Sequence, residues 1–170
     1  MAENDSNMVK KWKIAPFLNK GTSAAPDWVR IKKSTAFDIS LNPETQEYDY
    51  IADESPTTEL LRYKPSLNQA LTMYKGEEDY EMVFDRFFNL DTGSDATTDF
   101  LLVFYHEAST VGENTYYKAW KCSSVMAISD LNSVDSTITF DLYLNVTMSK
   151  GYVTISDGAP SYTEGDIPTE

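Results

Sequence analysis

Two residues of this chain could take part in nucleophilic catalysis: His106, its only histidine, and Cys122, its only cysteine. A Ser-His-Asp or Cys-His site would have to use His106 as its general base. Cys122 occupies the apolar face of an alternating segment, where burial disfavours the thiolate that a nucleophile requires. We therefore expect both residues to be structural and the chain to contain no catalytic residue.

Metal and cofactor sites have little support in the sequence. Asp91, Asp95 and Asp99 recur at every fourth position and could in principle hold a cation, but they do not match the EF-hand pattern. The chain has no Cys/His cluster, no glycine-rich nucleotide motif, no HExxH and no CxxC. We expect no metal and no cofactor. A carboxylate pair for glycoside hydrolysis stays open, because three-dimensional separation defines such a pair.

Charge is unevenly distributed along the chain. The formal net charge is −13, from 27 acidic and 14 basic residues, so the protein as a whole would repel nucleic acid and anionic membranes. Residues 1–33 nevertheless carry seven Lys/Arg against three acids, whereas residues 34–100 carry four against fifteen. The segment KKWK at 10–13 is a weak nucleic-acid signal that the overall charge outweighs. Either the basic arm attracts the acidic body of another copy, or these charges only keep a monomer soluble.

The compartment follows from the cysteine count and the hydropathy. A single cysteine cannot form an internal disulfide. The first residues lack the basic and apolar regions of a signal peptide, and no run approaches the roughly 18 apolar residues of a membrane span. We therefore expect assembly in a reducing cytoplasm, with no membrane partner.

The pattern of apolar residues predicts a mostly β protein with one short helix, arranged as an antiparallel β-sandwich or barrel-like domain. Helical spacing occurs in residues 77–90, where apolar residues recur at positions i, i+3, i+4, i+7 and i+8, four of them aromatic. A polar N-terminal arm, 1–27, precedes the β domain of 28–148, and a C-terminal segment, 149–170, is expected to form one short strand followed by a loose tail. The expected strands are residues 29–41, 61–73 with a kink at Pro65, 100–105, 116–128 and 134–148.

The arm is too apolar to be a free tail. Trp12, Ile14, Phe17 and Leu18 would lie either on their own domain or on a neighbouring copy, and the sequence does not choose between the two.

The segment 134–148 gives the most unusual pattern. Apolar and polar residues alternate over fifteen residues, which as one strand would reach about 50 Å. Its polar face could line a wide water-filled space, as the inner wall of a large barrel does. The pattern alone favours the alternative, in which this face is the solvated outer face of an antiparallel sandwich.

The order of the segments EYDYIADESPTTEL, LLRYKPSLNQALTMYKGEEDYE, FDRFF and STITFDLYLNV resembles the tail tube (major tail) proteins of tailed phages, of the siphophage kind. The likeness is strongest over residues 46–88. It implies hexameric rings that stack into a tube, with strands of each subunit joined in a continuous inner β-barrel. It also implies a loop, 42–57, that reaches the adjacent ring. The implied inter-ring residues are Glu44, Glu47, Tyr48, Asp49, Tyr50, Asp53 and Glu54, with Lys10, Lys11, Trp12 and Lys13 of the arm on the opposite side.

The same resemblance implies the environment of the protein. It would belong to the virion tail, be assembled in the host cytoplasm, and contact copies of itself, a tape measure protein, and the tail terminator and distal tail proteins. DNA would pass through the tube without specific binding. The implied lumen residues are Asp135, Thr137, Thr139, Asp141 and Asn145.

A rival interpretation from another class is a soluble β-sandwich that recognises a carbohydrate or a receptor. Tyr116, Tyr117 and Trp120 could form its aromatic platform, although the same residues suit a core or a subunit interface.

Overall fold

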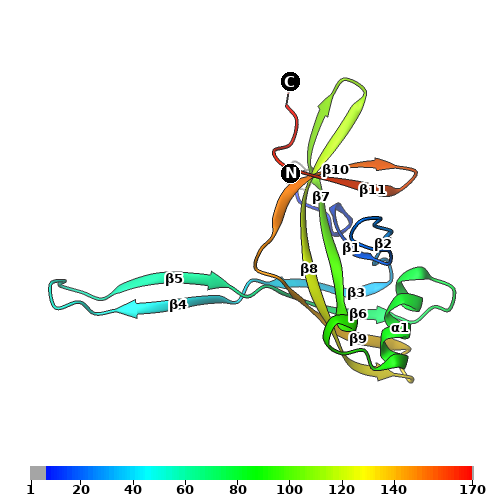
Figure 1. The fold of residues 1–170 in the computed structure, drawn as a ribbon, viewed down its shortest axis with the longest axis horizontal. Helices are drawn as coiled ribbons and strands as arrows, with labels where there is room; N and C mark the ends of the chain where they lie inside the picture. Colours follow the sequence, from blue (N-terminus) through cyan, green and yellow to red (C-terminus); the bar gives the residue numbers. More distant parts are fainter. Residues whose placement is uncertain (1–6, 170) are drawn as a thin grey trace, which may run out of the picture.

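Nine antiparallel strands join one sheet that curls into a half-barrel within residues 7–169, the part of the chain that the computed structural model describes (Figure 1). Their order along the sheet is β2-β1-β7-β8-β9-β6-β3, with the β10–β11 hairpin attached to β8, and β4 and β5 form a separate hairpin. The strands are β1 Ile14–Asn19, β2 Trp28–Arg30, β3 Ser34–Ser40, β4 Pro43–Tyr48, β5 Thr57–Tyr63, β6 Ser66–Thr72, β7 Thr97–Val111, β8 Asn114–Asn132, β9 Thr137–Leu144, β10 Ser149–Ser156 and β11 Ala159–Glu164. The helices are α1 Glu78–Asn89 and the short 3-10 turns η1 Lys11–Lys13 and η2 Gly93–Ala96. The predicted class, mostly β with one helix and a barrel-like antiparallel sheet, is confirmed.

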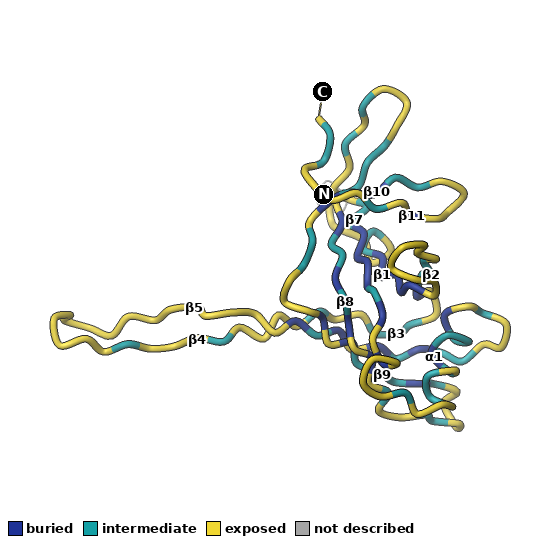
Figure 2. The backbone as a smooth tube through the Cα atoms, in the orientation of Figure 1, coloured by how far each residue is buried: buried dark blue, intermediate teal, exposed yellow. Residues whose placement is uncertain are grey.

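The long strands β7 and β8 form the centre of the sheet. Phe100 and Leu102 of β7 belong to one hydrophobic core, whereas Leu101 and Val103 belong to a second core on the other face. The continuous apolar run expected at 100–105 is therefore covered on both sides (Figure 2). The two cores fix the curl of the sheet, because burial of apolar surface on each face requires a separate covering layer.

The helix α1 covers the first core. Val83 is fully buried, and Tyr80, Met82 and Phe87 pack around it, which agrees with the helical spacing in the sequence. Its last residue is followed by Leu90 in the left-handed conformation, whose N–H bonds the carbonyls of Arg86 and Phe87.

A buried carboxylate divides the strand that the sequence predicted at 29–41. Asp79 of α1 is 3% exposed, and its Oδ2 accepts hydrogen bonds from the backbone N–H groups of Lys32, at 2.8 Å, and Lys33, at 3.2 Å. These two bonds satisfy the backbone where it turns from β2 into β3. The prediction of one continuous strand was wrong, because a side chain 46 residues away ends it.

The N-terminal arm is also shorter than predicted. Residues 14–19 form β1, which pairs with β2 on one side and β7 on the other. Ala15, Phe17 and Leu18 are buried in the two cores. Of the two alternatives for the apolar arm residues, packing on the parent domain therefore holds for Ile14, Phe17 and Leu18, whereas Trp12 is 58% exposed.

The fifteen-residue strand predicted at 134–148 was wrong. β9 has eight residues, Thr137–Leu144. Asn132 ends β8 by building a turn: its Oδ1 accepts hydrogen bonds from the N–H groups of Val134, at 3.0 Å, and Asp135, at 3.2 Å. At the other end the Oδ1 of Asn145 accepts the N–H of Thr147. These local side-chain bonds interrupt an apolar alternation that otherwise continues.

Two further boundaries differ from the prediction. Pro65 separates β5 from β6, so residues 61–73 are not one kinked strand, because proline cannot donate to the ladder. The segment 149–170 contains a complete hairpin, β10–β11, instead of one short strand and a loose tail. Gly151 allows β10 and β11 to lie close together, since a Cβ there would stand 2.1 Å from the carbonyl oxygen of Thr163.

The Asp79 carboxylate is expected to be a main stabilising contact between α1 and the sheet. We expect Asp79→Ala to lower the free energy of unfolding by about 1 to 2 kcal/mol, because two backbone N–H groups lose their acceptor. Urea unfolding followed by circular dichroism measures the change. Glu78→Ala, an exposed residue of the same helical turn, is the control, and equal effects of the two substitutions would contradict the role of Asp79.

Candidate functional site

The β4–β5 hairpin projects from the body of the protein (Figure 1). Every residue of β5 is exposed, and β4 is exposed except for partial cover at Glu44 and Tyr48 (Figure 2). The hairpin is closed at its neck by the N–H of Lys64, which bonds the carbonyl of Leu41 at 2.9 Å. An isolated two-stranded hairpin is at best marginally stable in water. A contact with another molecule would supply the cover that the parent domain does not give.

All seven inter-ring residues proposed from the sequence lie in this hairpin. The rings of Tyr48 and Tyr50 stack at 5.6 Å between centroids, close to the turn. Glu44 lies near the neck, where hydrogen bonding to Arg62 and Lys64 holds the pKa of its carboxyl below the usual value. The remaining acidic residues, Glu47, Asp49, Asp53 and Glu54, are exposed, with Asp49, Asp53 and Glu54 grouped at the turn.

The hairpin also presents apolar residues that the analysis of the sequence did not select. Leu60, Leu61 and Tyr63 of β5 are 47%, 50% and 44% exposed, and a register shift lies between their pairs with β4. Ile51, at the turn, is fully exposed. The alternating pattern at 61–73 predicts one strand with a kink at Pro65 and gives no sign that Leu61 and Tyr63 lie on a separate, exposed hairpin.

One face of the sheet is polar where β3, β6, β9 and β8 run side by side. The register aligns Asp38, Asn68, Asp141 and Ala127 in one row across these strands. The Nδ2 of Asn68 donates to Asp141 at 2.8 Å. The opposite faces of β6 and β9 carry the buried residues of the first core.

The five lumen candidates are divided between this face and the loops. Thr137, Thr139 and Asp141 lie on β9 and alternate with buried Ile138, Phe140 and Leu142, as the sequence predicted. Asp135 and Asn145 lie in the turns that flank the strand. The N–H of Asp135 donates to Asn132 in one turn, and the side chain of Asn145 accepts the N–H of Thr147 in the other. The cross-strand register brings two further polar residues, Asp38 and Asn68, into one row with Asp141, and no sequence pattern indicates this arrangement.

Two strand edges of this four-stranded region are open among the described residues. β3 pairs with β6 alone. β7 pairs with β8 only as far as Thr97 and Val125, so the last residues of β8, 126–132, pair with β9 on one side only. Unpaired edges of this kind readily pair with another chain.

A groove, hereafter the arm groove, lies between the N-terminal arm and the first half of β3. Lys11 and Trp12 of the arm line it together with Arg30, Phe37 and Gln69. The side chain of Lys13 lies 4.4 Å from the Trp12 ring centroid, and Lys10 precedes η1. Of the four arm residues selected from the sequence, Lys11 and Trp12 therefore lie beside β3 at the edge of the sheet.

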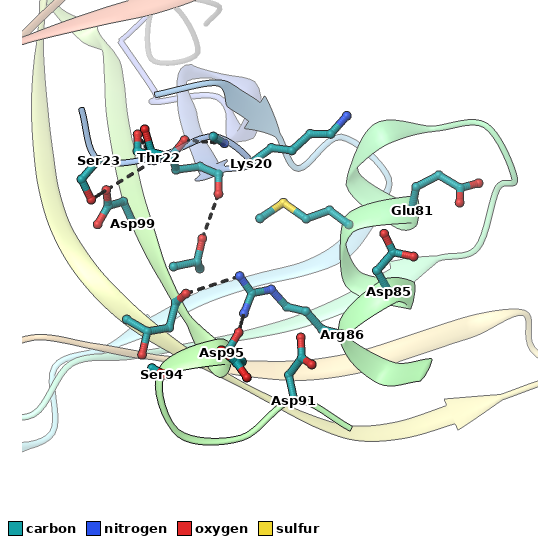
Figure 3. A pocket seen from close by; sticks show the side chains of 15 residues that line it. Lys20, Thr22, Ser23, Glu81, Asp85, Arg86, Asp91, Ser94, Asp95 and Asp99 are labelled. Atoms are coloured by element: carbon teal, nitrogen blue, oxygen red, sulfur yellow. Dashed lines mark hydrogen bonds between the residues drawn. The ribbon is translucent and has the colours of Figure 1, made fainter. Parts of the chain in front are cut away.

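A second concave region is shown in Figure 3 and is strongly acidic. Arg86 of α1 donates to the backbone carbonyls of Asp95 and Thr97, which ties the helix to η2. Burial lowers the pKa of the Arg86 guanidinium, and Asp91 and Asp95 oppose this shift. Among the residues described, no three Asp, Glu, His or Cys side chains are placed to hold a metal ion. The oxygen of Asp99 instead accepts hydrogen bonds from Asn19 and Ser23.

The two residues with nucleophilic potential are far apart. Cys122 pairs with Phe100 of β7, and His106 lies six residues further along that strand, roughly 20 Å away at strand spacing. Burial raises the pKa of the Cys122 thiol to about 11. His106 is exposed and its ring packs edge to face on Phe104.

The aromatic residues of the rival interpretation do not form one platform. Tyr117 packs on the second core and contacts Tyr105, whereas Trp120 packs on the first core against Phe104. Tyr116 contacts Tyr152. Because each ring packs on another ring of the same chain, these side chains are part of the packing between strands.

No protein-family model matches the chain, and no curated protein matches it as a relative. None of the helices in the described part of the chain is long and apolar enough to cross a membrane.

The thiol of Cys122 gives a direct test for a reactive site. With a pKa of about 11, it should contain on the order of 100-fold less thiolate at neutral pH than an unperturbed cysteine. We expect the folded protein to react correspondingly slowly with a chromogenic disulfide reagent, and the urea-unfolded protein to react at the rate of a free cysteine. Equal rates in both states would contradict a buried, unreactive thiol.

Proposed function

We propose that the protein is the repeating subunit of a phage tail tube, and that it acts by assembling with copies of itself. The β4–β5 hairpin is the observation on which the proposal depends: it projects from the body, is exposed throughout, and carries both acidic and apolar residues. A hairpin that no other part of its own chain covers is expected to pack against another subunit. The likeness of residues 46–88 to tail tube proteins supports the same interpretation.

Ring formation would use the two open edges of the four-stranded region. β3, β6, β9 and β8 are successively antiparallel, so β3 and β8 run in opposite directions. A copy rotated about an axis along the strands would therefore place residues 126–132 of its β8 antiparallel to β3. Repetition of this contact closes a barrel and leaves no exposed edge. The number of copies, six, comes from the resemblance alone.

The polar face would then line the tube. Its row of Asp38, Asn68 and Asp141, and its neighbours Thr137 and Thr139, contain no basic residue. A lumen of this composition repels the phosphate backbone, so DNA would move without specific binding. Asp135 and Asn145 would lie at the two ends of the β9 wall segment. A tape measure protein would occupy the lumen before DNA release, and terminator and distal tail proteins would cap the ends of the tube in the virion.

Removal of the hairpin separates folding from assembly. We expect a variant in which Asn-Gly replaces residues 43–63 to unfold at the same urea concentration as the intact protein, because the hairpin contributes no residue to either core. The variant should remain monomeric in sedimentation and form no filaments under the electron microscope, whereas the intact chain forms long hollow filaments at high concentration.

The charge of the variant provides an internal control. The residues removed include six acids and one arginine, so the variant is less negative than the intact chain, and increased repulsion cannot explain a loss of assembly. Filaments from the shortened variant would exclude the hairpin from stacking. An intact chain that stays monomeric and binds a glycan would overturn the proposed function.

A further inference from the structure

The arm groove has the chemistry of a binding site. Its volume is about 680 Å³. Ile14, Pro16 and Phe37 supply apolar lining, and Lys11 and Lys32 supply positive charge at exposed positions. Arg30 adds a third cation, whose position is fixed by a hydrogen bond to the carbonyl of Trp12 at 3.3 Å. An apolar groove bordered by cations fits an acidic segment that also carries apolar side chains.

A buried amide gives an independent indication that something binds there. Gln69 lines the arm groove and is fully buried, yet neither its Oε1 nor its Nε2 has a hydrogen-bond partner. Buried polar groups in folded proteins are nearly always paired. Its neighbour across the strands, Phe37, is 39% exposed at the open edge of β3. The unpaired amide therefore lies next to the part of the groove that a second molecule can reach.

The hairpin tip, residues 49–55, has the complementary chemistry. Asp49, Asp53 and Glu54 are exposed there, and Ile51 extends fully into solvent. The tip contains no basic residue. Figure 1 shows it far from the body of its own chain, so it meets a groove only on another copy.

We propose that the hairpin tip of one copy seats in the arm groove of the next, with Ile51 against the apolar lining and the three carboxylates against Lys11, Arg30 and Lys32. This contact rests on the proposed function, and it identifies the arm groove as the surface that receives the hairpin in the stack. The groove borders the first half of β3, and the hairpin leaves from the other end of that strand. Donor and receiver therefore lie at opposite ends of one element, which produces an open, head-to-tail stack instead of a closed dimer.

Charge reversal on each side tests the contact. We expect Lys11→Glu with Lys32→Glu, and separately Asp53→Lys with Glu54→Lys, to raise the critical concentration for filament formation roughly tenfold or more, because like charges then meet. Combining all four substitutions in one chain should restore filaments to within about threefold of the intact protein. Lys20→Glu with Lys150→Glu, two exposed lysines outside the groove, is the matched control and should have no comparable effect.

The results separate this inference from the proposed function. Filament formation by the intact chain tests the function alone. If the intact chain forms filaments and the groove variant behaves like the control, or if the fourfold variant fails to recover, the tip does not bind this groove while the tube proposal stands.

Gln69 offers a test in which binding and structural roles predict opposite signs. We expect Gln69→Leu to raise the urea midpoint of the monomer, because the substitution removes an unpaired buried amide. We also expect it to raise the critical concentration for assembly on the order of tenfold, because the groove loses a hydrogen-bonding partner for the tip. A lower midpoint together with weaker assembly would assign Gln69 a structural role only and would overturn its part in the contact. Leu71→Met, at a buried position of the same strand, controls for general repacking.

Discussion

The structure depends on the length of β8, which belongs to two different layers. Its first part pairs with β7 and β10, and its last seven residues continue beyond β7 and pair, among the described strands, with β9 alone. A twisted sheet whose central strand runs through both regions cannot stay flat and bury both faces, so it curls and acquires two hydrophobic cores. The continuation of β8 also creates the open edge opposite β3. The two cores and the open edge that we propose for ring formation thus have the same origin.

Much of this architecture can be predicted from the sequence, and the wrongly predicted strand boundaries share one physical cause. The helical spacing at 77–90 and the apolar run at 100–105 locate α1 and the doubly covered part of β7, because those signals arise from burial itself. The predicted boundaries at 29–41 and 134–148 were wrong because backbone N–H groups donate hydrogen bonds to the side-chain oxygens of Asp79 and Asn132, and these bonds end the strands. The alternation of apolar and polar residues gives no information about such side-chain hydrogen bonds. Turn chemistry outweighs periodicity wherever a side chain provides an acceptor for otherwise unpaired N–H groups.

The candidate assembly surfaces were only partly predictable for a similar reason. The acidic turn of the hairpin lies between Pro43 and Pro56 and is visible in the sequence, but only the resemblance selected Asp49, Asp53 and Glu54 as contact residues. The arm groove could not, because it forms only when β1 joins the sheet and places η1 beside β3. Gln69 stands between Leu67 and Leu71 on the apolar face of the alternating pattern, but the sequence does not show that its buried amide has no hydrogen-bond partner.

Charge explains how a chain with open edges could remain soluble and still associate in one direction. Two copies at a net charge of −13 repel at a distance, which opposes the edge-to-edge pairing that leads to aggregation. That repulsion is weakest when the basic arm of one copy faces the acidic hairpin of another, because these segments carry charge of opposite sign. Head-to-tail approach is therefore favoured over other orientations before any surface is buried. Apolar contacts and strand pairing act only at short range, so orientation by charge would precede the stronger interactions and determine which of them form.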